Sequence, residues 1–99
     1  MIPATRYQRQ HAVVLGLGKT GQSLWRSLHH GGADVSLWDD DAASRQRAAE
    51  LGGVVLAAPQ LPAGTGILAV SPGIAPSHTL VQQARERAIP LRTDLDLLY

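Results

Sequence analysis

The stretch VVLGLGKTGQS, residues 13–23, decides the fold because two different phosphate-binding loops share parts of its pattern. Its Gly-Lys-Thr segment, residues 18–20, matches the end of the G-x-x-x-x-G-K-[ST] loop that wraps ATP phosphates. That loop would need a glycine at position 13, which is Val13, and the apolar residues 12–15 indicate a buried strand in place of a loop. The ATP-loop interpretation is therefore excluded.

The glycines of the same stretch favour a different turn. Gly16, Gly18 and Gly21 form G-x-G-x-x-G, between an apolar run at residues 11–15 and a helix-compatible run at residues 20–30. In this context the first glycine permits the tight turn, the second lets a ligand approach the backbone, and the third lets helix and strand pack closely. Free N–H groups at the helix start, together with the helix dipole, would attract an anion. Such turns also occur without a ligand, so other segments must support the interpretation.

Length and composition fit one small domain. The chain has 99 residues, 44% of them hydrophobic, and a net charge of +1, which favours neither nucleic-acid nor membrane binding. No apolar run approaches the roughly 20 residues of a membrane span, and residues 1–10 lack the apolar core of a signal peptide. The absence of cysteine fits a cytoplasmic location. Because phenylalanine is also absent, we expect a core of aliphatic residues with Trp25 and Trp38.

Strand and helix patterns alternate along the chain. We expect strands at residues 11–15, 34–38, 54–56, 67–70 and 91–93, and helices at residues 20–30, 41–51 and 78–88. Repeated alternation implies right-handed crossovers, so the predicted fold is α/β: a Rossmann-like open parallel sheet of about five strands with helices on both faces. We divide the chain into a lead-in at residues 1–10, a domain at residues 11–94 and the start of a linker at residues 95–99.

Three segments converge on one edge of this predicted sheet. Ligands of open parallel sheets bind beyond the carboxyl ends of the strands, and the glycine turn, Asp39 and Ser71–Ile74 each follow a strand. Asp39 lies 18 residues past Gly21, near the roughly 20-residue spacing at which an acidic residue meets the ribose of a dinucleotide. Lys19 lies inside the turn, where it would counter a phosphate charge. The sequence therefore predicts a nucleotide site at this edge.

Several of these residues also have a purely structural alternative. Asp40 or Asp41 would equally serve as the N-cap of the following helix, and the SPG segment fits a plain turn. A metal site at the Asp triplet is disfavoured because adjacent side chains on extended backbone point in opposite directions. His11 and His78 have no Asp or Ser partner at a useful spacing, so we expect no catalysis from them.

Four motifs together resemble the N-terminal domain of the Mur ligases. They are VVLGLGKTGQS, WDD after the second strand, AVSPGI at the fourth, and the closing IPLRTDLDLLY. The resemblance implies a three-domain cytoplasmic ligase of peptidoglycan synthesis, which uses ATP and Mg²⁺ to join UDP-MurNAc-L-alanine to D-glutamate through an acyl phosphate. This domain would bind the UDP end of that substrate and hold no catalytic residue, metal or cofactor of its own. Its partners would be the central and C-terminal domains of the same enzyme.

The resemblance also assigns residues to the substrate. The turn at Lys19 and Thr20 would contact the pyrophosphate, and Gly73 would pack near the base. Asp39 and Asp40 would lie by the uracil. Some members have Thr and Arg where this chain has Asp40 and Asp41, which leaves backbone contacts in place of a side-chain grip. The full set expected at the UDP moiety is Gly18, Lys19, Thr20, Gly21, Asp39, Asp40, Ser71 and Gly73.

The ATP-binding and amino-acid-binding domains of such a ligase are absent from these 99 residues. We therefore expect an excised or truncated domain without detectable ATP turnover, which by itself does not identify the amino acid added. Two alternatives stay open, an NAD(H)-binding regulatory module and the cofactor domain of a dehydrogenase. The glycine turn and the acidic residue after the second strand support both, whereas SPG after the fourth strand is not part of the nicotinamide pattern.

Overall fold

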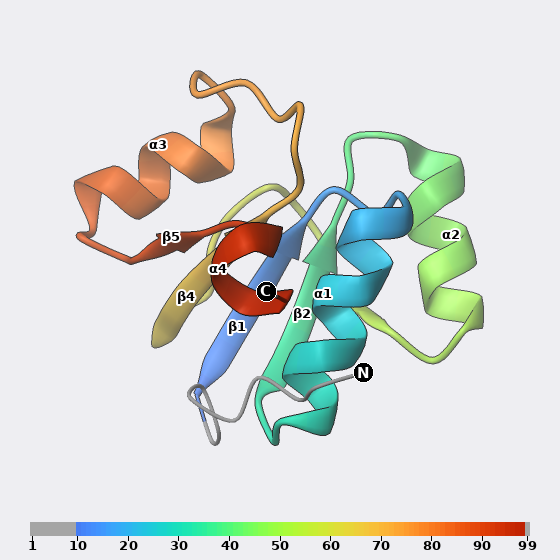
Figure 1. The fold of residues 1–99 in the computed structure, drawn as a ribbon. Helices are drawn as coiled ribbons and strands as arrows, with labels where there is room; N and C mark the ends of the chain where they lie inside the picture. The colour runs from blue at the N-terminus through green and yellow to red at the C-terminus, as the bar shows by residue number, and fades with distance from the viewer. Residues whose placement is uncertain (1–9, 99) are drawn as a thin grey trace.

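Five parallel strands form the centre of the molecule (Figure 1). The computed structural model describes residues 10–98, so nearly all of the expected lead-in lies outside the described residues. The strands are β1 (His11–Leu15), β2 (Asp34–Trp38), β3 (Val54–Val55), β4 (Thr65–Val70) and β5 (Leu91–Arg92). The helices are α1 (Lys19–His30), α2 (Ala42–Glu50), α3 (Thr79–Glu86) and α4 (Asp94–Leu98). The sheet order is β3-β2-β1-β4-β5, and each pairing is parallel.

The central strand β1 divides its side chains between two hydrophobic layers. Ala12 and Val14 pack into the layer that contains residues of α1, α2 and α4, and Val13 and Leu15 pack into the layer of α3. In Figure 1, α1 and α4 lie in front of the strands. This alternation is what a strand buried on both faces requires. The predicted fold class, with helices on both faces of a parallel sheet, is confirmed.

The chain reverses its direction of travel across the sheet between β3 and β4. The first three strands run outward from β1 to one side, and the loop that follows β3 brings β4 to the other side of β1. Leu61 in this loop is buried, and its N–H and carbonyl bond to Gln83 Oε1 at 2.8 Å and Arg87 Nη1 at 2.8 Å. The connections after β1 and β4 therefore diverge at the carboxyl ends of two neighbouring strands, which is where open α/β sheets bind ligands.

Most helices and strands begin and end within two residues of their predicted bounds, but α4 was not predicted. The structure starts β4 at Thr65, where we expected residue 67, and reduces β3 to two residues. Helix α4 follows Thr93, whose N–H donates to Asp96 Oδ2 at 2.8 Å, as in a capping box with Asp in place of Glu. That Thr-x-x-Asp spacing is the signal that would have found the helix.

Candidate functional site

The glycine turn joins β1 to α1 and depends on two of its three glycines. Gly16 has a φ of +93°, its N–H donates to the Trp38 carbonyl at 2.9 Å, and its own carbonyl accepts from Ser71 Oγ at 3.1 Å. A Cβ on Gly21 would lie 1.7 Å from the Gly16 carbonyl oxygen, so only glycine permits this approach of helix to turn. A Cβ on Gly18 would meet nothing within 4 Å, so this exposed position has room for a ligand.

Within the described residues 10–98, no side chain caps the N-terminus of α1. Its N-cap is Gly18, which has no side chain to cap the helix, and the first turn contains no acidic residue. The first intrahelical bond runs from the Gln22 N–H to the Gly18 carbonyl at 2.9 Å, and Lys19 is exposed at the first helical position. A lysine there opposes the helix dipole. Free N–H groups and a lysine together form a positive site that suits an anion.

Asp39 ties the glycine turn to the start of α2. Its Oδ2 accepts from the Leu17 N–H at 2.9 Å, and its Oδ1 accepts from the Asp41 N–H at 2.8 Å. The carboxylate thus bridges two turns that follow adjacent strands. It is half-buried, and each oxygen keeps a lone pair for a further donor. The sequence indicated Asp39 by its spacing but gave no sign of this bracing role.

Asp40 connects the loop after β2 to the start of α3. Its Oδ1 accepts from Trp38 Nε1 at 2.9 Å, and its carboxylate lies 3.0 Å from His78 Nε2. The hydrogen bonds from Trp38 and then His78 lower the pKa of Asp40 below its ordinary value, with smaller help from the positive charge of Arg45. Because this pKa is lowered, the hydrogen bonds to the ionised Asp40 carboxylate stabilise the fold at neutral pH. Their stabilisation is lost as the pH falls through the lowered pKa of Asp40.

The third aspartate is a helix cap. Asp41 Oδ2 accepts from the Ser44 N–H at 3.0 Å and from Ser44 Oγ at 2.8 Å, which lowers the pKa of Asp41. Of the two capping candidates in the sequence, Asp41 is the one used. Arg45 stacks 4.5 Å above the Trp38 ring and donates to the Asp39 carbonyl at 2.7 Å. The three aspartates therefore make hydrogen bonds to three different sets of partners. Within residues 10–98, no group of three His, Asp or Glu side chains could hold a metal ion.

The SPG segment is a type II turn against the glycine turn. Pro72 and Gly73 are its central residues, Gly73 has a φ of +90°, and the Ile74 N–H closes the turn to the Ser71 carbonyl at 3.4 Å. The Ser71 N–H donates to the Leu15 carbonyl at 3.0 Å. Ser71 is held at both its backbone and its hydroxyl, whereas Gly73 is exposed with open space beside it.

The structure therefore brings together the three segments that the sequence placed at one edge. Hydrogen bonds join the glycine turn to Asp39 on one side and to Ser71 on the other. The expectation that His11 and His78 lack partners is wrong, because sequence spacing does not reveal contacts across strands and loops. His11 Nε2 lies 3.1 Å from Ser36 Oγ on the adjacent strand, and His78 pairs with Asp40. The sequence also did not indicate the contacts of Arg45 with the Asp39 carbonyl and the Trp38 ring.

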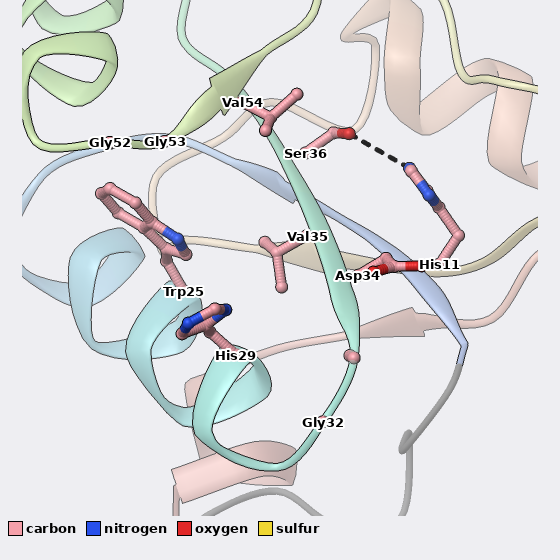
Figure 2. A pocket seen from close by; sticks show the side chains of 11 residues that line it. His11, Trp25, His29, Gly32, Asp34, Val35, Ser36, Gly52, Gly53 and Val54 are labelled. Carbon is pink, nitrogen blue, oxygen red and sulfur yellow. Dashed lines mark hydrogen bonds between the residues drawn. The ribbon is translucent and has the colours of Figure 1, made fainter.

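A cavity lies at the opposite edge of the sheet, where the strands begin. It has a volume of about 610 Å³ and is lined by the first residues of the strands, with Trp25 and His29 from α1 (Figure 2). It is a notch left by the short strand β3, which begins opposite Ser36 and leaves the start of β2 unpaired on that side. The C-terminal end of α1, rather than a helix N-terminus, faces it. Its volume alone does not make it the ligand site.

Fold and edge geometry define a Rossmann-like α/β domain with a glycine turn at the topological switch point. Residues 10–92 match the family model described as Mur ligase MurD-like, N-terminal domain, and the chain belongs to that family. This confirms the resemblance that the motifs indicated. Within residues 10–98, no helix is long and apolar enough to cross a membrane.

Similar proteins agree with this assignment. The chain is 36% identical over 105 residues to the UDP-N-acetylmuramoylalanine--D-glutamate ligase of Caulobacter vibrioides. This alignment covers 98% of the chain and 22% of that ligase. The chain is 41% identical over 93 residues to the ligase of the same name from Synechococcus sp., in an alignment that covers 87% of the chain and 19% of that ligase. The chain thus spans about a fifth of the length of these relatives.

Solved structures show the same fold in dehydrogenases. The match to L-tryptophan dehydrogenase from Nostoc punctiforme covers 90% of this chain and 34% of the dehydrogenase chain, with a TM-score of 0.63 and 19% identity. The match to shikimate dehydrogenase from Aquifex aeolicus covers 93% of this chain and 45% of the dehydrogenase chain, with a TM-score of 0.63 and 18% identity. At this identity the likeness concerns the fold alone.

Proposed function

We propose that this domain binds the UDP end of UDP-MurNAc-L-alanine as the N-terminal part of an ATP-dependent ligase that adds D-glutamate. Membership of the MurD-like family supports this, and relatives that align with almost the whole chain are named as UDP-N-acetylmuramoylalanine--D-glutamate ligases. Those relatives are about five times longer than the aligned part. Chemistry with ATP, Mg²⁺ and the amino acid would belong to the remainder of such a ligase.

The observation that carries the proposal is the uncapped, positive N-terminus of α1. Lys19 at the first helical position and a glycine N-cap both disfavour an isolated helix, and a bound pyrophosphate would reverse both effects. The backbone N–H groups of Gly18, Lys19 and Thr20 would donate to phosphate oxygens, while the Lys19 ammonium would supply charge. The lack of a side chain at Gly18 and Gly21 lets the phosphates approach.

The uridine would lie across the carboxyl end of β1, between Asp39 and the SPG turn. Asp39 keeps lone pairs that suit a donor from the base or ribose, and exposed Gly73 gives a flat backbone surface for the base. Ser71 would act by holding the glycine turn through its bond to the Gly16 carbonyl. Asp40 would border the uracil from the same turn as Asp39.

An NMR titration of the ¹⁵N-labelled 99-residue chain tests the proposal. UDP-MurNAc-L-alanine should shift the amide signals of Gly18, Lys19, Thr20, Asp39 and Gly73, whereas NAD⁺ at the same concentrations should not. Shifts caused by NAD⁺ alone would instead support the nicotinamide alternative. We also expect no ATP hydrolysis by this chain, since position 13 is Val13 and the glycine turn is not an ATP loop.

A further inference from the structure

The pair formed by Asp40 and His78 links two loops that leave strands on opposite sides of β1. The first loop, residues 39–41, follows β2, and the second, residues 71–78, follows β4. The link consists of contacts from His78 Nε2 to Asp40 Oδ2 at 3.0 Å and Oδ1 at 3.1 Å. In the described part of the chain, no other hydrogen bond joins these two loops.

The geometry of His78 fixes which nitrogen carries its proton. His78 is the N-cap of α3, and its Nδ1 accepts from the Leu80 N–H at 3.1 Å. An accepting Nδ1 has no proton, so in the neutral ring the proton is on Nε2 and is donated to Asp40. The His78 side chain is only 12% exposed, while that of Asp40 is 70% exposed. The histidine is thus the anchored partner and the aspartate reaches out to it.

The loop at residues 71–78 is consequently held at both ends. At its start, Ser71 bonds to the Leu15 and Gly16 carbonyls, and at its end His78 bonds to Asp40. The exposed turn at Pro72 and Gly73 lies between these two attachments. On the other side of the link, Trp38 Nε1 donates to Asp40 and Arg45 stacks on Trp38, so Asp40 is itself held against β2 and α2.

We propose that Asp40 and His78 form a clasp that sets the position of the SPG turn over the uridine site, and that Asp40 is a positioning residue. This inference rests on the proposed function. The Asp40 carboxylate already accepts hydrogen bonds from Trp38 and His78, so its effect on the ligand is exerted through the loop. The clasp pre-orders the 71–78 loop, and without it the ligand must order that loop on binding.

Two substitutions separate the clasp from other roles of these residues. His78→Asn keeps a favoured N-cap for α3 but removes the Nε2 donor, and Asp40→Ala removes the acceptor. Asp40→Asn keeps one oxygen for Trp38 and His78 and serves as the conservative rescue. His29→Asn is the matched control, because His29 is an exposed histidine near the opposite edge.

The affinity of each variant for UDP-MurNAc-L-alanine would be measured on the 99-residue chain, with thermal unfolding as a check of the fold. We expect Asp40→Ala and His78→Asn each to weaken binding about three- to tenfold, the double variant to be no weaker than either, and Asp40→Asn to recover most of the loss. His29→Asn should bind as the wild type does. The ¹⁵N signals of the His78 ring should report an Nε2 proton in the wild type and change in Asp40→Ala.

The possible results are distinguishable. If the wild type binds and Asp40→Ala alone weakens binding, Asp40 contacts the ligand directly and the clasp is contradicted. Equal affinity in all variants also contradicts it, while leaving the proposed function in place. If the wild type does not bind the UDP ligand, the proposed function fails and this inference fails with it.

Discussion

The two edges of the sheet offer a ligand different things. The edge at which the strands begin, the amino edge, has a cavity of about 610 Å³. This cavity faces the C-terminal end of α1 and arises because β3 is short. The carboxyl edge has the uncapped N-terminus of α1 and an exposed lysine. It also has three turns joined by hydrogen bonds that the Asp39 carboxylate accepts and that Ser71 Oγ donates. The uncapped helix start at the carboxyl edge favours that edge for the proposed nucleotide site over the edge with the cavity.

The largest effect is expected from Gly21→Ala at the carboxyl edge. Its Cβ would lie 1.7 Å from the Gly16 carbonyl oxygen, so helix and turn must move apart, at a cost of about 3 kcal/mol in the free energy of unfolding. Urea denaturation measures this. Gly18→Ala is the control, because its Cβ would meet nothing within 4 Å and its φ of −71° suits alanine.

Gly18→Ala should therefore fold as the wild type does, yet bind UDP more weakly because its methyl group occupies the side on which the phosphates approach. Equal stability of Gly18→Ala and Gly21→Ala would contradict the role given to the third glycine. Unchanged UDP binding by Gly18→Ala would contradict the close approach at the second.

Asp39→Asn should cause the next largest loss in the free energy of unfolding, because it breaks the link between the glycine turn and α2. Asparagine offers one oxygen to two backbone N–H donors and turns its NH₂ group toward the other, at a cost of about 2 kcal/mol in the free energy of unfolding. Asp41→Asn is the matched control, because asparagine is also a favoured N-cap. If both variants unfold at the same urea concentration, the bracing role of Asp39 is wrong.

Lys19→Gln should change stability and binding in opposite directions. Removing a positive charge from the N-terminus of α1 should stabilise the helix by about 0.3–1 kcal/mol, and the same change should weaken UDP binding roughly tenfold at low salt. Thermal unfolding and a binding titration measure the two effects. Arg26→Gln removes the same charge from the middle of α1 and should leave UDP affinity unchanged. A drop in both stability and affinity for Lys19→Gln would point to a structural lysine.

The smallest effect is expected at the amino edge. Asp34 is exposed beside the large cavity, and Asp34→Asn should change the free energy of unfolding by less than about 0.5 kcal/mol. Its affinity for UDP should equal that of the wild type in the same titration. A clear loss of affinity would place the ligand in the cavity at the amino edge and contradict a site at the carboxyl edge.

The fold was predictable because its signals are local. The G-x-G-x-x-G turn, the apolar strands and the Gly or Pro stops depend on near neighbours in the chain. They predicted a parallel sheet of about five strands with helices on both faces, which the structure confirms. Helix α4 was missed because residues 95–99 were assigned to the start of a linker, although the Thr93 and Asp96 capping pair marks the start of this helix. The short β3 was overextended by one residue because its apolar run continues to Leu56.

The candidate site was predictable in place but not in detail. The rule for open parallel sheets brought Gly16, Asp39 and Ser71 to one edge before any contact was known. Their hydrogen bonds join residues far apart in the chain, such as Leu17 to Asp39 and Ser71 to Gly16. The partner of His78 was missed for the same reason, because the sheet order that places it near Asp40 is a property of the whole fold.

The most direct test of the central claim is a paired NMR titration of the wild-type chain with UDP and with uridine. Both ligands carry the base and ribose, but UDP alone carries the diphosphate assigned to the N-terminus of α1. We expect UDP to shift the amide signals of Gly18, Lys19 and Thr20 strongly, and uridine to leave them nearly unchanged. Equal shifts from the two ligands, or UDP shifts confined to residues around Trp25 and Asp34, would contradict a pyrophosphate site at the glycine turn.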